Sequence, residues 1–217
     1  VTYSITPYGP APTSCVGATV DVSVVVNPTA QVNDIDSEVV CNGGWTTAVG
    51  FTTNRTGGST SYSWSISGSI GQPSSSGTTD NIPSFQVVNT GDAPISATVT
   101  VTPTYTNGSV PCPGPSKTFT ITVNPTPVLT PTNNAAFICY DGSTDIDLSS
   151  NVTGTGYRWT VSSSPAVTWV AGRAPVAQPT TADVTNISQQ LAHTGTEPVT
   201  VTYSITPYGP APTSCVG

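Results

Sequence analysis

Apolar residues alternate with threonine and serine along several stretches of the chain, and this pattern predicts most of its structure. Every second residue is apolar in 95–102, and the same alternation occurs in 20–26, 62–66, 119–123 and 199–205. Each stretch would have one buried and one solvated face, which is typical of antiparallel sheets. Clusters of Gly, Pro, Asn and Ser separate the stretches at short intervals, as in a β-sandwich. We therefore expect an all-β protein built as an immunoglobulin-like sandwich.

A repeat organises the chain. Residues 1–17 and 201–217 have the same sequence, so the period is 200 residues. A weaker repeat of half that length lies inside it, because Val26-Asn27-Pro28-Thr29 recurs as 123–126 and the Trp64 strand recurs around Trp159. Because such periods indicate repeat architectures, we interpret the chain as one period of a tandem array plus a short overlap.

The repeat predicts three parts. Residues 1–27 would be the C-terminal two strands of a preceding module, 28–125 a complete sandwich, and 126–217 a second sandwich that lacks its last strand. Within the first part, 18–27 should take the last-strand position beside 1–6. The connector Asn-Pro-Thr-Pro ends one sheet before the next begins, because proline lacks a backbone donor. Such short proline-rich connectors are semi-rigid, so the modules should form a rod.

Composition excludes several classes of protein. Only 4 Lys and Arg stand against 11 Asp and Glu, which argues against nucleic-acid binding. No apolar run is long enough for a membrane-spanning helix, so we expect no membrane insertion of this segment. Thr and Ser make up almost a third of the residues. A chain that opens without Met is expected to be a piece of something longer.

The tryptophans at 64 and 159 lie in the middle of predicted strands. A Trp on the third strand of an immunoglobulin-like sandwich fills the centre of the core. We therefore assign Trp64 and Trp159 to the two cores, with ligand stacking as the alternative.

The cysteines occur as one early and one late residue per module. This arrangement favours disulfides Cys41–Cys112 and Cys139–Cys215, with Cys15 paired to a cysteine upstream. The alternatives are Cys15–Cys41 and Cys112–Cys139 across the junctions, or free buried thiols. The absence of CxxC and the single His exclude the usual zinc patterns. Disulfides would imply an oxidising, extracellular location.

Three aspartates, Asp141, Asp145 and Asp147, lie close together, and 34–38 holds a comparable acidic group. Alternate carboxylates near a module junction are candidate Ca²⁺ ligands. Neither group has the spacing of a twelve-residue calcium loop. Solvated edge charges that discourage sheet-to-sheet pairing are the plainer interpretation.

Catalytic chemistry has little support. His193 is the single histidine, and the residue at its place in the other module is Asn89, so we interpret it as a turn residue. Nucleophile-elbow, phosphate-loop and metalloprotease motifs do not occur. We expect no enzyme and no cofactor. Tyr8, Tyr208 and Trp169 are candidates for stacking on sugars, although a Pro-flanked Tyr more often packs over a junction.

The run ATVTVTPTYTNGSVPCPGPSKTFTITVNPTP at 97–127 resembles repeats of the SprB-like cell-surface adhesins of gliding Bacteroidetes. Those repeats are similar to polycystic-kidney-disease (PKD)-like, immunoglobulin-type sandwiches. The resemblance covers 28–125 well and is looser in 126–217. The preceding part of the module also carries it, in the order Cys41, Phe51, Trp64, Ile82, Phe85 and Asn89.

The resemblance implies a type IX-exported protein held at the outer surface, carried along it by a motor and attached to the substratum. We therefore expect a structural and adhesive repeat segment of a long extracellular filament with a part in gliding motility. Its partners would be neighbouring modules of the same chain and a surface or polysaccharide substratum. The alternatives are a polysaccharide-binding module and spacer repeats beside an enzyme.

Overall fold

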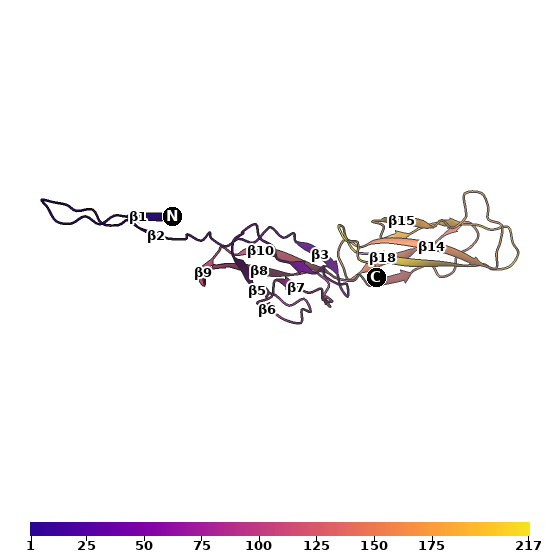
Figure 1. The fold of residues 1–217 in the computed structure, drawn as a ribbon. Helices are drawn as coiled ribbons and strands as arrows, with labels where there is room; N and C mark the ends of the chain where they lie inside the picture. The colour runs from indigo at the N-terminus through magenta and orange to yellow at the C-terminus, as the bar shows by residue number, and fades with distance from the viewer.

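The computed structural model describes all residues from 1 to 217, and its regular structure consists of β-strands alone. No helix is present that could reach across a membrane. Figure 1 shows an elongated molecule in which a thin hairpin arm, a first module and a second module follow one another in line. The prediction of an all-β protein made of sandwich modules in a rod is confirmed.

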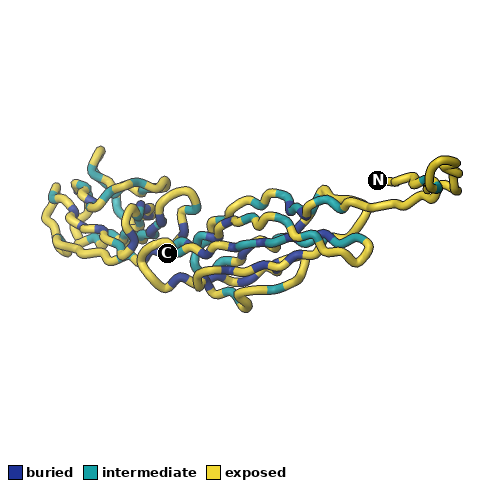
Figure 2. The backbone as a smooth tube through the Cα atoms, turned by 90° about the vertical axis from the view of Figure 1, so that its left-hand side faces the viewer, coloured by how far each residue is buried: buried dark blue, intermediate teal, exposed yellow.

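The arm is formed by β1 (Thr2–Ile5) and β2 (Val20–Ser23). The two strands pair antiparallel, with Tyr3 opposite Val22, so the expected pairing of 18–27 with 1–6 is confirmed. The arm points away from both modules, and nearly all of its residues are exposed (Figure 2). Its strands therefore have partners for their hydrogen bonds but no core for their apolar side chains.

The first module packs a main sheet against a smaller layer. In the main sheet the order is β3-β10-β8-β5-β6, with β9 beside β8, and a second pair is formed by β4 and β7. Most neighbours are antiparallel, but β10 and β3 are parallel. The strands are β3 (Glu38–Cys41), β4 (Val49–Gly50), β5 (Ser59–Ser67), β6 (Ser76–Gly77), β7 (Asn81–Ile82), β8 (Ile95–Asn107), β9 (Val110–Pro113) and β10 (Lys117–Asn124).

The alternation along β5, β8 and β10 supplies nine of the 15 residues of one continuous buried core. Val99 and Val101 are fully buried between the layers, while the threonines that alternate with them face outward. Trp64 is buried among them and its indole N–H donates to Thr79 Oγ1 at 3.2 Å. Burial of a Trp requires such a partner for its one donor.

The second module has the same kind of strands in smaller sheets. Its sheets have the orders β15-β14-β18, β11-β13-β16 and β12-β17, and its core cluster holds 5 buried residues. Trp159 is one of them, and its indole N–H donates to the Val176 carbonyl at 2.9 Å. The strands are β11 (Leu129–Asn133), β12 (Gly142–Ser143), β13 (Ile146–Ser150), β14 (Gly156–Ser164), β15 (Gln178–Ala182), β16 (Asn186–Ile187), β17 (Gln190–Leu191) and β18 (Thr200–Tyr208).

The two cores differ in size because one edge of the main sheet differs between the modules. In the first module β8 is flanked by β5 and by β10, whereas in the second module β18 has only β14 beside it. The second module therefore has an open sheet edge where the first has its last strand.

Candidate functional site: the module junction and the open groove

A disulfide joins the two modules. Cys41 ends β3 of the first module, and Cys215 lies in the loop after β18 of the second, with the two Cα atoms 5.5 Å apart. Cys41 is held in place by the parallel pairing of β3 with β10, which sets it opposite Asn124. Cys215 is buried against this end of the first module. The disulfide thus lies beside the connector that links the modules.

Polar contacts accompany the disulfide across the same junction. Asn124 Nδ2 donates to Thr213 Oγ1 at 2.7 Å, and Asn151 Nδ2 donates to Asp92 Oδ1 at 2.5 Å. The loop also presses on the connector, because a Cβ at Gly217 would overlap the carbonyl oxygen of Pro127. Only glycine allows this approach. The modules are therefore fixed to one another by one covalent bond, two side-chain hydrogen bonds and a close backbone contact.

The observed pairing corrects both disulfides expected from the spacing of the cysteines. Cys41–Cys112 does not form, because Cys112 lies in β9 just before the start of β10 while Cys41 lies beside its end. The 8 residues of β10 separate them by roughly 25 Å, and bonded Cα atoms lie within about 7 Å. Cys139–Cys215 does not form either, because Cys215 is bonded to Cys41. Cys15, Cys112 and Cys139 are free thiols in this chain.

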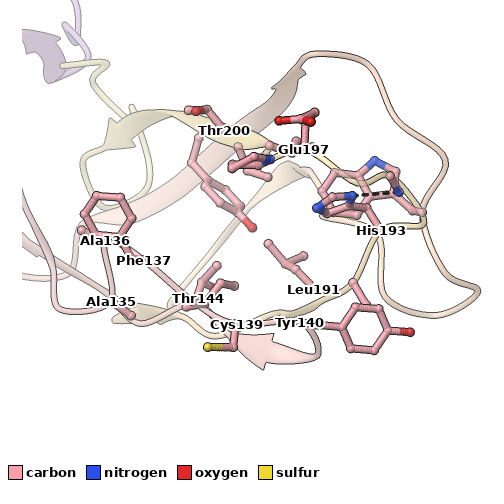
Figure 3. Close-up of a pocket in the computed structure, with 18 of the residues that line it drawn as sticks. Ala135, Ala136, Phe137, Cys139, Tyr140, Thr144, Leu191, His193, Glu197 and Thr200 are labelled. Carbon is pink, nitrogen blue, oxygen red and sulfur yellow. Dashed lines mark hydrogen bonds between the residues drawn. The ribbon is translucent and has the colours of Figure 1, made fainter.

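A groove of about 510 Å³ opens along the free edge of the second module (Figure 3). The residues 135–140 form one wall, and β18 with Val201 and Tyr203 forms the other. Phe137 is 97% exposed there, although large apolar residues are normally buried. Burial within the groove raises the pKa of the Tyr203 hydroxyl, which donates to Gln189 Oε1 at 2.9 Å. The groove is thus lined mainly by apolar side chains and has the unpaired edge of β18 on one side.

The candidate calcium ligands are engaged in protein contacts. Asp141 pairs with Arg173 at 2.5 Å, whereas Asp145 and Asp147 both accept from Asn186 Nδ2, at 2.6 and 2.9 Å. The structure therefore does not bring the three carboxylates together as one cluster able to hold a metal ion. Hydrogen bonds from Asn186 and then Asn134 hold the pKa of Asp147 below its usual value. In the earlier acidic group, Asp34 pairs with Lys117 and Glu38 accepts from the Thr47 amide.

His193 and Asn89 play equivalent parts in their turns. The Gly195 amide donates to His193 Nδ1 at 3.1 Å, and the Gly91 amide donates to Asn89 Oδ1 at 3.0 Å. Asn89 also donates from Nδ2 to the Val123 carbonyl on β10 at 2.8 Å. His193 has no last strand to reach and instead lines the groove.

The candidate aromatic residues lie in different surroundings. Tyr8 is exposed on the arm, whereas Tyr208, at the same place in the second copy of the repeat, is half-buried under the Arg158 guanidinium at 4.3 Å. Trp169 packs edge-on to His193, with ring centroids 6.2 Å apart. The three aromatic rings therefore do not form one continuous aromatic surface.

Two functional features were missed by the sequence reasoning, namely the Cys41–Cys215 pair and the apolar groove. A signal for the groove was present, because the repeat predicts that the second module lacks its last strand, whereas the spacing of the cysteines gave no signal for the Cys41–Cys215 pair.

Comparison with known proteins supports the class of fold. Residues 136–217 match the family of PKD-like domains. Since the match spans most of the second module, that module is similar to PKD-like domains, and the chain consists of tandem β modules. The comparisons identify no catalytic domain.

Among solved structures, the crystal structure of the chicken CNTN1 FN1-FN3 domains is similar, with 13% identity and a TM-score of 0.35. The match covers 90% of this chain, which spans 64% of that one. No curated protein matches the sequence.

Proposed function

We propose that the chain is a structural and adhesive repeat segment of a long extracellular surface filament, and that this filament serves adhesion in gliding motility. The observation that carries the proposal is the Cys41–Cys215 disulfide across the module junction. A filament that transmits force needs junctions that neither bend freely nor come apart. A covalent bond beside the connector, together with the hydrogen bonds Asn124–Thr213 and Asn151–Asp92, supplies that stiffness.

The same disulfide supports an extracellular location of the protein. Disulfides persist in oxidising surroundings and are rare in the cytosol, which supports a position outside the cell. The net charge of −7 and the threonine-rich outer faces favour a soluble rod that does not self-associate laterally. Resemblance to the SprB-like adhesins supports the gliding role and the type IX route of export.

The distribution of exposed aromatic side chains favours a filament over a polysaccharide-binding module. Sugar binding by stacking needs several aromatic rings on one surface, but the exposed ones are spread over the arm and both modules. They are Tyr3, Tyr8, Trp45, Phe137 and Tyr140.

The test uses cells that make the protein. Antibodies against the 217-residue chain should label intact cells, and their monovalent Fab fragments should block attachment and movement. Fab fragments against an unrelated surface protein serve as the control. Labelling only after permeabilisation would overturn the extracellular location. Normal attachment with saturating Fab would overturn the adhesive role, and normal attachment with arrested movement would separate the motility role from adhesion.

A further inference from the structure

The Cys41–Cys215 disulfide encloses most of the chain in one covalent loop. The two cysteines are separated by 174 positions, so the loop contains the residues from 42 to 214. These residues include every strand of the two modules except β3, that is, all strands from β4 to β18. A load applied before Cys41 and after Cys215 therefore has a covalent path that passes through the disulfide and avoids the loop.

The first module contributes only one edge to this path. Its edge segment, residues 34–41, ends with β3 and runs parallel to β10 toward the second module (Figure 1). Asp34 pairs with Lys117 at the start of β10, and Cys41 lies opposite Asn124 at its end. The edge segment and β10 thus cover the same length with the same number of residues. Because a strand is already close to full extension, tension can lengthen the edge segment by only a few ångströms.

Hydrogen bonds hold the backbone on both sides of the disulfide. The Thr120 amide donates to Ser37 Oγ at 3.0 Å, which fixes the edge segment to β10. Directly after Cys41, the Asn42 amide donates to the Asn124 carbonyl at 2.8 Å. On the other side, the Gly209 amide donates to the Cys215 carbonyl at 2.7 Å. Tension would therefore reach the two sulfur atoms without first drawing out loose chain.

We propose that the edge segment and the disulfide form a strap that carries tension past both cores, so that the modules stay folded while the chain is under load. Tension passes along residues 34–41, through the two sulfur atoms and out beyond Cys215. The second module then hangs from the strap as part of a closed loop, and the first module is loaded only along its edge.

The strap changes which bonds resist the load. Without the disulfide, the load would pass in turn through each strand from β4 to β18, and these strands are held by backbone hydrogen bonds and apolar contacts. Each such hydrogen bond contributes only about 1 kcal/mol net, whereas the strap consists of covalent bonds throughout. Reduction of the disulfide removes the strap, so the junction is also a redox switch between a short tether and a long one.

The strap goes beyond the proposed function, because it follows from the covalent connectivity of the chain. It would act in any protein that contains these modules and is pulled along its length. Failure of the adhesive role would leave it unchanged.

Optical tweezers that hold the full chain by peptide tags at its two ends measure the strap, with the free thiols alkylated. The oxidised wild type should release no more than the chain before Cys41, roughly 150 Å at about 3.6 Å per residue. A dithiol reductant should then release the loop, whose 174 positions add roughly 600 Å. In that exchange the reductant becomes a cyclic disulfide, while Cys41 and Cys215 become thiols.

Two variants control for the disulfide. Cys41→Ser should show the long path at once without reductant. Cys112→Ser is the matched control and should keep the short path, because Cys112 is a free thiol. The measured quantity is the length of the covalent path, so a Cys41→Ser chain that failed to fold would still show the long one. Steps as long as a whole module in the oxidised wild type, or a short path in Cys41→Ser, would overturn the proposal.

A fluorescent Fab that recognises only the folded second module tests whether the modules stay folded. It should bind the oxidised chain equally well with and without load, and it should be lost from the loaded chain once the reductant is added. Loss of the Fab from the loaded, oxidised chain would overturn the protection of the modules, even if the path stayed short. Neither measurement involves cell attachment, so the strap and the adhesive role succeed or fail separately.

Discussion

Removal of the Cys41–Cys215 bond should destabilise both modules, although neither core contains the bond. Consider the double variant Cys41→Ser with Cys215→Ser. In the wild type, unfolding of the second module leaves Cys215 tied beside Asn124 of the folded first module. Unfolding of the first module likewise leaves Cys41 tied near Pro127. The cross-link thus closes a loop in either partly unfolded state.

The number of residues in the closed loop sets how much stability the disulfide contributes. From Asn124 to Cys215 the closed loop contains roughly 90 residues, for which the chain-entropy relation gives about 4.5 kcal/mol. The loop from Cys41 to Pro127 has nearly the same length and gives nearly the same value. Since about 1 kcal/mol shifts the midpoint by at least ~4 °C in a domain of this size, the midpoint should fall by ~15 °C or more.

Differential scanning calorimetry under non-reducing conditions measures this effect, with the remaining thiols alkylated in every sample. Cys112→Ser is the control, because Cys112 is a free thiol whose loss should leave the midpoint unchanged. The reasoning is refuted if the double variant melts within about 2 °C of the wild type, a shift worth less than ~0.5 kcal/mol. A large drop in Cys112→Ser would refute it as well, since it would indicate a cross-link within the first module.

Three further changes test other parts of the structure. Trp64→Ala should destabilise the first module by about 3–5 kcal/mol because it empties the centre of a 15-residue core, which chemical denaturation would measure. Gly114→Ala should destabilise the same module by about 1–3 kcal/mol because its Cβ would overlap the Ala30 carbonyl, while Gly50→Ala, with nothing near its Cβ, should change stability by less than ~0.5 kcal/mol. Asn186→Ala should raise the pKa of Asp147 in an NMR titration, because it removes the hydrogen bond that lowers this pKa in the folded state, and an unchanged pKa would contradict the assignment. The contribution of this hydrogen bond to stability is present above pH 3.8 and is lost as the pH falls through the pKa of Asp147 in the folded protein.

The parts of the fold that depend on local periodicity could be predicted from the sequence. Alternation along 95–102 places Val99 and Val101 in a core whatever the strand order, because side chains of a strand alternate between its faces. The arm could be predicted because the repeat shows which strand follows which. The burial of Trp64 and Trp159 could be predicted from their position in the middle of a strand.

The disulfide could not be predicted, because sequence spacing does not say at which end of a module a cysteine lies. That requires the parallel pairing of β3 with β10, which brings Cys41 to the end of β10 and leaves Cys112 near its start. Parallel pairs join residues far apart in the sequence and leave no local pattern. The open edge of β18 could be predicted, because the repeat leaves the second module without its last strand, but the side chains that line the groove could not.

The loop that carries Cys215 has the same conformation with and without a neighbouring module. The Gly9 amide donates to the Cys15 carbonyl at 2.8 Å in the exposed copy, and Gly209 donates to Cys215 at 2.7 Å in the docked copy. Ser14 and Ser214 both have positive φ, 36° and 44°. Because the loop is already ordered before it docks, it loses little conformational entropy at the junction. The sequence of the loop therefore encodes a preformed loop, and the cysteine it presents can bond to the neighbouring module without a rearrangement of the loop.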